Sequence, residues 1–337
     1  MNFSKHWAAT LDDYAIDLAW SPGGTILAAA STAGRVTLYD AATGTVLRTL
    51  AGHAGGTNCL SWSETGSWLA TGGQDGFVRI WDPSTGELRV ELQLGSAWVE
   101  HLAWPPANSQ FPSYLAAAAG RRLVFLNNNG SIAHQFPDAP KTISALAWKP
   151  DGAACASACF GHAVIWDATT FAAQKEFPYG NAIYALTWSP DGRWLVAGCH
   201  DNAVHLWVPA EDLELHMSGY ETRLKELSFS HDSKWLATGG GRDACVWDCT
   251  GAGPEGREPL LLPHNARVCA LAFQHSHGLL AAGATNGEFT LWSPARKNPM
   301  IAEVKMPSAA TKFVWRPDDS LLAVGTEQGQ VFVFKTA

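Results

Sequence analysis

The sequence contains little charge and no long apolar run. Charged residues make up 16% of the 337 positions, and no stretch reaches the roughly 18 consecutive apolar residues that a transmembrane helix needs. The first residues include Lys5, Asp12 and Asp13 and lack the apolar core of a signal peptide. We therefore expect no membrane partner, no secretion signal and a cytoplasmic location.

Motifs for metal, phosphate and nucleic-acid binding are also missing. The seven cysteines and twelve histidines form no paired C-x-x-C and no H-E-x-x-H motif. Glycine pairs such as Gly72-Gly73 end apolar segments in turns and do not open helices, which a phosphate-binding loop would require. A net charge of -8 argues against a protein whose main task is to grip a polyanion. We expect no cofactor, no bound metal and no nucleic-acid partner.

What the sequence does have is an internal repeat. The segment Ala185-Leu186-Thr187-Trp188-Ser189-Pro190-Asp191-Gly192 is a typical copy, and sixteen tryptophans are many for this length. Eight aromatic residues close similar segments at intervals of 40 to 44 residues: Trp20, Trp62, Trp104, Trp148, Trp188, Phe229, Phe273 and Trp315. Because no 3.6-residue apolar periodicity runs through a unit, helical repeats are excluded.

Each unit is predicted to consist of four short antiparallel strands. In the second unit, apolar and β-branched segments at 59–62, 68–71, 77–81 and 88–92 are separated by turns rich in Gly, Asp and Pro. Four antiparallel strands per unit are typical of a β-propeller blade.

The repeats resemble those of the WD40 family. The Trp-Asp pair of that family stands at Trp81-Asp82, Trp166-Asp167 and Trp247-Asp248, and its Gly-His pair stands at Gly52-His53. The resemblance covers nearly the whole chain and implies a single β-propeller domain, residues 1–337, that acts as a scaffold or adaptor for other proteins. It also implies a structural hydrogen-bonded set in the second unit, in which Asp75 orients His53, His53 meets Thr71 and Thr71 reaches Trp81.

Strand counting predicts an all-β, eight-bladed WD40 β-propeller. The chain ends after the third strand of its last unit, and residues 6–11 precede the first unit. Leu11 lies nine residues before Trp20, as Met306 lies nine before Trp315. The N-terminal segment is therefore predicted to pair into the last blade and close the ring. A seven-bladed ring is the alternative, because residues 105–114 stretch the first hairpin of the third unit.

In the WD40 family, partners usually dock on the narrow face around the central channel. Transferring the loops of that face to this sequence selects aromatic, acidic and basic residues from the third, fifth, sixth and seventh units. They are Trp98, Glu100, Tyr184, His200, Arg223, Lys225, Arg242 and Arg267. We interpret these residues as a surface for a partner protein or acidic peptide, with an aromatic side chain as the apolar anchor.

Two other functions stay open. A metal-handling propeller would use Cys159, Cys199, His200 and Cys269 near the channel mouth. An enzyme would need clustered acid and base groups, and the predicted face offers only Glu100, Glu327 and His200, on separate units. We expect no catalytic residue and a monomeric scaffold.

Overall fold

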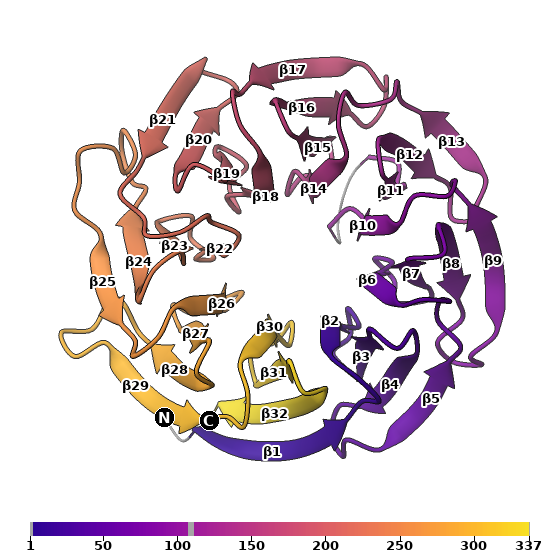
Figure 1. Ribbon diagram of the computed structural model, residues 1–337, viewed down its shortest axis with the longest axis horizontal. Helices are drawn as coiled ribbons and strands as arrows, with labels where there is room; N and C mark the ends of the chain where they lie inside the picture. Colours follow the sequence, from indigo (N-terminus) through magenta and orange to yellow (C-terminus); the bar gives the residue numbers. More distant parts are fainter. Residues whose placement is uncertain (1–2, 107–110, 337) are drawn as a thin grey trace.

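Eight four-stranded antiparallel sheets form a closed ring around a central axis, as Figure 1 shows. The computed structural model describes residues 3–106 and 111–336, and within them the chain forms 32 strands and no helix. Each sheet is one blade, with its first strand nearest the axis and its fourth at the rim. Eight blades are thus confirmed.

Blades 1 to 4 follow one another without interruption. Their strands are β2 (Ala15–Trp20), β3 (Ile26–Ser31), β4 (Val36–Asp40) and β5 (Val46–Leu50); β6 (Thr57–Trp62), β7 (Leu69–Gly73), β8 (Phe77–Trp81) and β9 (Leu88–Gln93); β10 (Val99–Ala103), β11 (Leu115–Ala119), β12 (Arg122–Leu126) and β13 (Ile132–Gln135); and β14 (Ile143–Trp148), β15 (Ala154–Cys159), β16 (His162–Asp167) and β17 (Ala173–Pro178). The predicted strands of the second unit agree with β6 to β9 to within two residues at each end.

Blades 5 to 7 repeat this order, and blade 8 is completed by the N-terminal strand. Their strands are β18 (Ile183–Trp188), β19 (Leu195–Cys199), β20 (Val204–Val208) and β21 (Leu213–Met217); β22 (Leu227–Phe229), β23 (Trp235–Thr238), β24 (Asp243–Asp248) and β25 (Leu260–Pro263); β26 (Val268–Phe273), β27 (Leu280–Ala284), β28 (Glu288–Trp292) and β29 (Met300–Lys305); and β30 (Ala310–Trp315), β31 (Leu321–Thr326), β32 (Gln330–Thr336) and β1 (Phe3–Thr10). Within these residues, no helix is long and apolar enough to span a membrane.

The weak third unit forms an ordinary blade. Strand β11 consists of a leucine and four alanines, all buried, because neighbouring blades cover both faces of the sheet. Small residues suit a strand that is covered on both sides. Residues 107–110 of the stretched hairpin lie outside the described part of the chain.

The repeated tryptophan joins neighbouring blades. The indole Nε1–H of Trp62 donates to the carbonyl of Ala19 in blade 1, at 3.1 Å, and that of Trp148 donates to Ala103 in blade 3, at 2.8 Å. The same bond links Trp188 to blade 4 and Trp315 to blade 7. A residue with a large apolar body and one donor suits this position, which explains the period of the aromatic residues.

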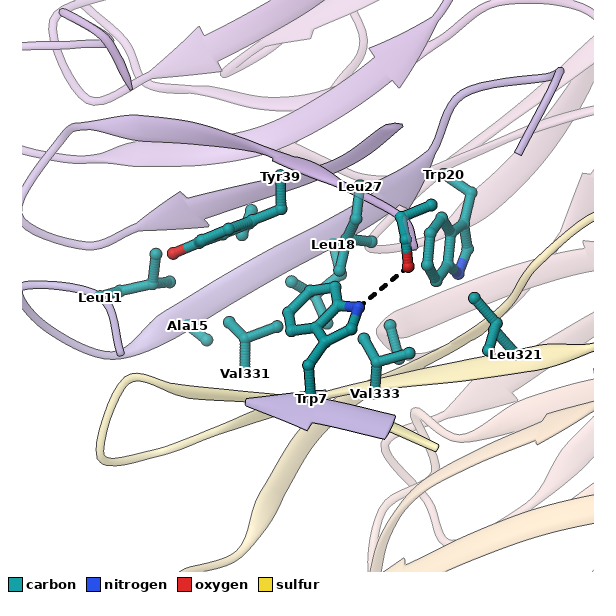
Figure 2. Close-up of a cluster of buried hydrophobic side chains, with 13 residues drawn as sticks. Trp7, Leu11, Ala15, Leu18, Trp20, Leu27, Tyr39, Leu321, Val331 and Val333 are labelled. Carbon is teal, nitrogen blue, oxygen red and sulfur yellow. Dashed lines mark hydrogen bonds between the residues drawn. The ribbon is translucent and has the colours of Figure 1, made fainter. Parts of the chain in front are cut away.

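The two ends of the chain close the ring. Strand β1 pairs antiparallel with β32, with Trp7 opposite Val333. The Trp7 side chain is 8% exposed, packs among residues of blades 8 and 1, and donates its indole N–H to Ala41 at 2.9 Å (Figure 2). The predicted closure is confirmed, although the strand begins at Phe3 rather than at residue 6.

Candidate binding face

The antiparallel order of each blade decides which loops share a face. The connection into a first strand and the turn between the second and third strands lie at the same end of the blade, because each strand reverses direction. We call this end of the ring the connection face. Arg223 and Lys225 precede β22, Arg267 precedes β26, and His200 follows β19. All four therefore belong to the connection face.

A compact aromatic and basic cluster spans blades 5 and 6. The hydroxyl of Tyr184 and Nδ1 of His200 share a hydrogen bond of 2.8 Å. The guanidinium of Arg223 lies 5.6 Å and the ammonium of Lys225 lies 5.5 Å from the centre of the Tyr184 ring. Both distances are within the range of cation–π attraction. The aromatic ring of Tyr184 therefore holds two cationic side chains beside it.

A cavity of about 430 Å³ continues this cluster towards blades 7, 8 and 1. Arg223, Lys225 and Arg267 line it, together with Tyr14 and Glu327. The predicted residues Tyr184, His200, Arg223, Lys225 and Arg267 thus form one continuous surface, which we call the basic arc.

The other three predicted residues do not line the cavity of the basic arc. Trp98 is 50% exposed beside β10 in blade 3, and blade 4 separates it from Tyr184. Glu100 lies on β10, where burial raises the pKa of its carboxyl. Arg242 lies in the turn before β24, where its carbonyl accepts from the His264 backbone N–H. Trp98 and Glu100 on blade 3 therefore lie apart from the basic arc, whereas Arg242 lies on blade 6 but does not line the cavity.

Sequence reasoning missed one exposed aromatic residue on this face. Cys159 was assigned to the face, but its side chain is 2% exposed and it pairs with Ile143 inside blade 4. Phe160 follows β15 as His200 follows β19, and it is 50% exposed. The error was one residue of register, because the turn after β15 is shorter than its counterpart in blade 2.

The cavity also contains a carboxyl group with altered acidity. Glu226 lines the cavity, and the backbone N–H of Lys225 donates to its Oε2 at 3.2 Å. Burial raises the pKa of Glu226 despite the opposing effect of Arg267 and Lys225. Burial also raises the pKa of the Cys269 thiol to about 12, so this thiol is neutral near pH 7.

The residues considered for metal binding or catalysis do not lie together in one site. Cys199 is fully buried, and burial raises the pKa of its thiol to about 12. Across residues 3–106 and 111–336, no group of three or more His, Cys, Asp or Glu side chains could hold a metal ion. Glu327 lines the cavity on blade 8, whereas Glu100 and His200 belong to blades 3 and 5.

The structural set of blade 2 is a chain of hydrogen bonds. Asp75 Oδ1 lies 2.8 Å from Nδ1 of His53, and Nε2 of His53 lies 2.8 Å from the Thr71 hydroxyl. The Trp81 indole donates to the same hydroxyl at 3.0 Å. Burial lowers the pKa of His53, so the neutral imidazole can accept from Thr71 while donating to Asp75. The side chains that His53 contacts in this set, Asp75 and Thr71, both belong to blade 2, so the set has a structural role.

Tyrosines take the place of this histidine in two other blades. Tyr179 donates to Asp201 at 2.5 Å in blade 5, and Tyr220 shares a 2.9 Å hydrogen bond with Thr238 in blade 6. Each tyrosine lies nine residues before the aromatic that ends its first strand, as His53 does. The nine-residue spacing therefore marks this position in the sequence even where the residue is not a histidine.

Known proteins share the fold and the repeats of this chain. A crystal structure of the computationally designed Ika8 protein superposes with a TM-score of 0.84 and 20% sequence identity, covering 99% of this chain and 100% of that chain. That likeness shows a common fold. No curated protein matches the chain. The family model described as the IFT122 first beta-propeller matches residues 15–251. This match spans more than half of the sequence, and the protein therefore belongs to the family of the IFT122 first beta-propeller.

Proposed function

We propose that the protein is an interaction scaffold that binds an acidic peptide, or an acidic surface of a partner protein, on its connection face. Membership of a β-propeller family supports a general scaffold role. The basic arc supports the choice of partner, because it gathers three exposed cations around a cavity in a protein of net charge -8.

The arrangement of charges is the observation that carries this proposal. Arg223, Lys225 and Arg267 come from two neighbouring blades and converge on one cavity, so a single acidic segment could contact all three. Tyr184 adds a rigid apolar surface beside them. Aromatic residues and arginines are the side chains that most often carry binding energy at interfaces, and complementary charge raises the rate of association.

Charge reversal on the basic arc should weaken this binding. We expect Arg223→Glu combined with Arg267→Glu to weaken binding of a fluorescent Asp/Glu-rich peptide that contains one tyrosine by at least tenfold, because two attractive charges become repulsive. Fluorescence anisotropy at low and at physiological salt measures the effect, and the wild-type affinity should fall as salt rises.

A matched double variant on the opposite face serves as the control. Arg296 and Lys297 are exposed in the turn between β28 and β29, at the other end of blade 7 from Arg267. Arg296→Glu combined with Lys297→Glu makes the same change in net charge and should leave affinity within about twofold. Equal losses from both double variants would mean that net charge, rather than the arc, determines binding.

Peptide binding should strengthen as the pH falls from neutrality. Burial raises the pKa of Glu226 in the cavity, so its carboxylate is protonated at a higher pH than an ordinary glutamate and one repulsive charge disappears. A peptide of cysteic acid keeps its sulfonates ionised over this range and is the appropriate probe. Glu226→Gln should bind at neutral pH as tightly as the wild type does at low pH. An unchanged pH profile in this variant would contradict the assignment.

A further inference from the structure

In each blade one side chain from the connection that enters the blade lies against the second and third strands, as His53 does in blade 2. We call this position the slot. In seven of the eight blades that the described residues form, the backbone N–H of the slot residue donates to a carbonyl in the second turn of the preceding blade. This bond joins His53 to Gly34, Ala139 to Arg121 and Tyr179 to Gly161, at 3.0, 2.9 and 2.7 Å. From blade 1 to blade 8 the slot residues are Leu11, His53, Leu94, Ala139, Tyr179, Tyr220, His264 and Met306. Of these eight, all within the described residues, Ala139 alone is small.

The slot of blade 4 is accordingly hollow. A cavity of about 350 Å³ lies there, and Ala139, Ser157, Val164 and Trp166 are among its walls. Leu123 and Ile143 add apolar surface from blades 3 and 4. The chain therefore leaves open in blade 4 a space that it fills with a large side chain in the other seven blades.

Blade 4 retains the tryptophan and the hydroxyl residue of the structural set, which are the part that a slot residue would contact. The Trp166 indole donates to the Ser157 hydroxyl at 2.8 Å, as Trp81 donates to Thr71 in blade 2. In blade 2 the hydroxyl hydrogen of Thr71 then meets Nε2 of His53. In the described part of the chain, the Ser157 hydroxyl hydrogen has no corresponding acceptor, although the residue is buried. A buried donor without an acceptor favours a ligand that supplies one.

The slot of blade 4 lacks a positive charge that the slot of blade 2 has. Arg79 pairs in register with Glu91 in blade 2, and the two side chains form an ion pair of 2.7 Å. Their counterparts in blade 4 are Val164 and Glu176, so the cation is missing while the carboxylate stays.

Two carboxyl groups and an imidazole line the blade 4 slot. Glu176 lines the cavity together with Asp138 and His162. The His162 ring is directed to the Cys159 thiol, 3.9 Å away, and the Arg121 guanidinium donates to the Ala139 carbonyl. A donor carried by the occupant would therefore meet a carboxylate at the rim of the slot.

We propose that the slot of blade 4 binds a histidine side chain supplied by a partner protein. An imidazole offers one nitrogen that accepts from Ser157 and one N–H that donates to Glu176 or Asp138. Blades 2 and 7 place an imidazole of this chain in the same slot. The site is separate from the basic arc and does not depend on an acidic partner.

Free imidazole is the simplest probe of this site. Titration of the ¹⁵N-labelled protein should shift the indole N–H resonance of Trp166 saturably, with that resonance assigned through Trp166→Phe. Ala139→His should fill the slot from within, so that the melting temperature rises and the imidazole affinity falls at least tenfold. Ser157→Ala should also weaken binding about tenfold while the cavity stays open, which distinguishes a hydrogen-bonded site from an apolar void.

A blade 2 variant is the positive control, and a tripeptide tests the partner. His53→Ala should create a second imidazole site that is reported by the Trp81 indole. The blocked peptide Gly-His-Gly should bind the wild-type protein at least tenfold more tightly than Gly-Ala-Gly or Gly-Arg-Gly. An unresponsive Trp166 resonance, retained binding in Ala139→His, or tighter binding of methylguanidinium or Gly-Arg-Gly would each overturn the proposal.

Discussion

Removal of residues 1–10 should leave a protein that no longer holds a closed, soluble ring. Strand β1 is the outer strand of blade 8, and without it β32 becomes an exposed edge. Trp7 also leaves the core shared by blades 8 and 1, where Val331 and Val333 pack. Truncation of one buried tryptophan side chain costs about 3–5 kcal/mol, while a whole domain is stable by only about 5–15 kcal/mol. An exposed strand edge also promotes aggregation.

Size-exclusion chromatography and thermal denaturation of the truncated protein measure this effect. We expect aggregated or poorly folded material. Trp7→Ala keeps the strand but removes its anchor and should lower the free energy of unfolding by about 3–5 kcal/mol. Ser4→Ala changes an exposed position of the same strand and should have no effect. A truncated protein that remained monomeric with an unchanged melting temperature would show that β1 does not close the ring.

The second large effect is expected from Asp75→Ala in blade 2. Asp75 accepts from His53, from the backbone of Ala54 and from Arg79, whose guanidinium lies 2.8 Å away. Hydrogen bonds to a charged group contribute about 1.5–3 kcal/mol each, and Arg79 loses one of its two carboxylate partners. We expect the free energy of unfolding to fall by about 2–3 kcal/mol, because the remaining partners can be partly rehydrated.

Chemical denaturation compared with peptide affinity separates scaffold from binding. Affinity for the acidic peptide should stay unchanged in Asp75→Ala, since the set lies in blade 2 and the basic arc in blades 5 to 7. Asp201→Ala in blade 5 removes a carboxylate with one side-chain partner, Tyr179, and should cost about 1 kcal/mol. If affinity fell in Asp75→Ala while stability held, the set would be part of the binding surface.

The stability contributed by Asp75 should also depend on pH. Burial alone would raise the pKa of its carboxyl, but hydrogen bonds from Arg79 and His53 outweigh that effect and lower the pKa. A carboxyl group with a lowered pKa stabilises the folded protein when it is ionised. Its contribution is therefore complete above the pKa of the unfolded chain and is lost as the pH falls through the folded value.

The fold was predictable because the repeat leaves a signature at fixed positions. In five of the eight blades that the described residues form, the tryptophan that ends the first strand bonds the preceding blade, so residues such as Trp62, Trp148 and Trp188 recur at a regular period. The nine-residue spacing of Leu11 before Trp20 similarly revealed the N-terminal strand. Both signals depend on contacts that recur around the ring.

The candidate site was only partly predictable, because it depends on differences between blades. The sequence placed Trp98 and Tyr184 on one face, in the third and fifth units, but did not show which of the predicted residues line a common cavity. It assigned Cys159 instead of Phe160, because the shortened turn of blade 4 shifts the register by one residue. The empty slot at Ala139 could not be predicted from the sequence, because the nine-residue spacing marks the position but does not show whether neighbouring side chains fill the space that an alanine leaves.

Hydrogen exchange at the chain ends tests closure of the ring most directly. Amide hydrogens of β1 and β32 should exchange slowly and together in the intact protein, because the two strands pair along nearly their whole length. Their protection should match that of the interior strand β31. Rapid exchange of residues 5–10 beside a protected β31 would show that the N-terminal segment is not part of blade 8, and the eight-bladed closed ring would have to be abandoned.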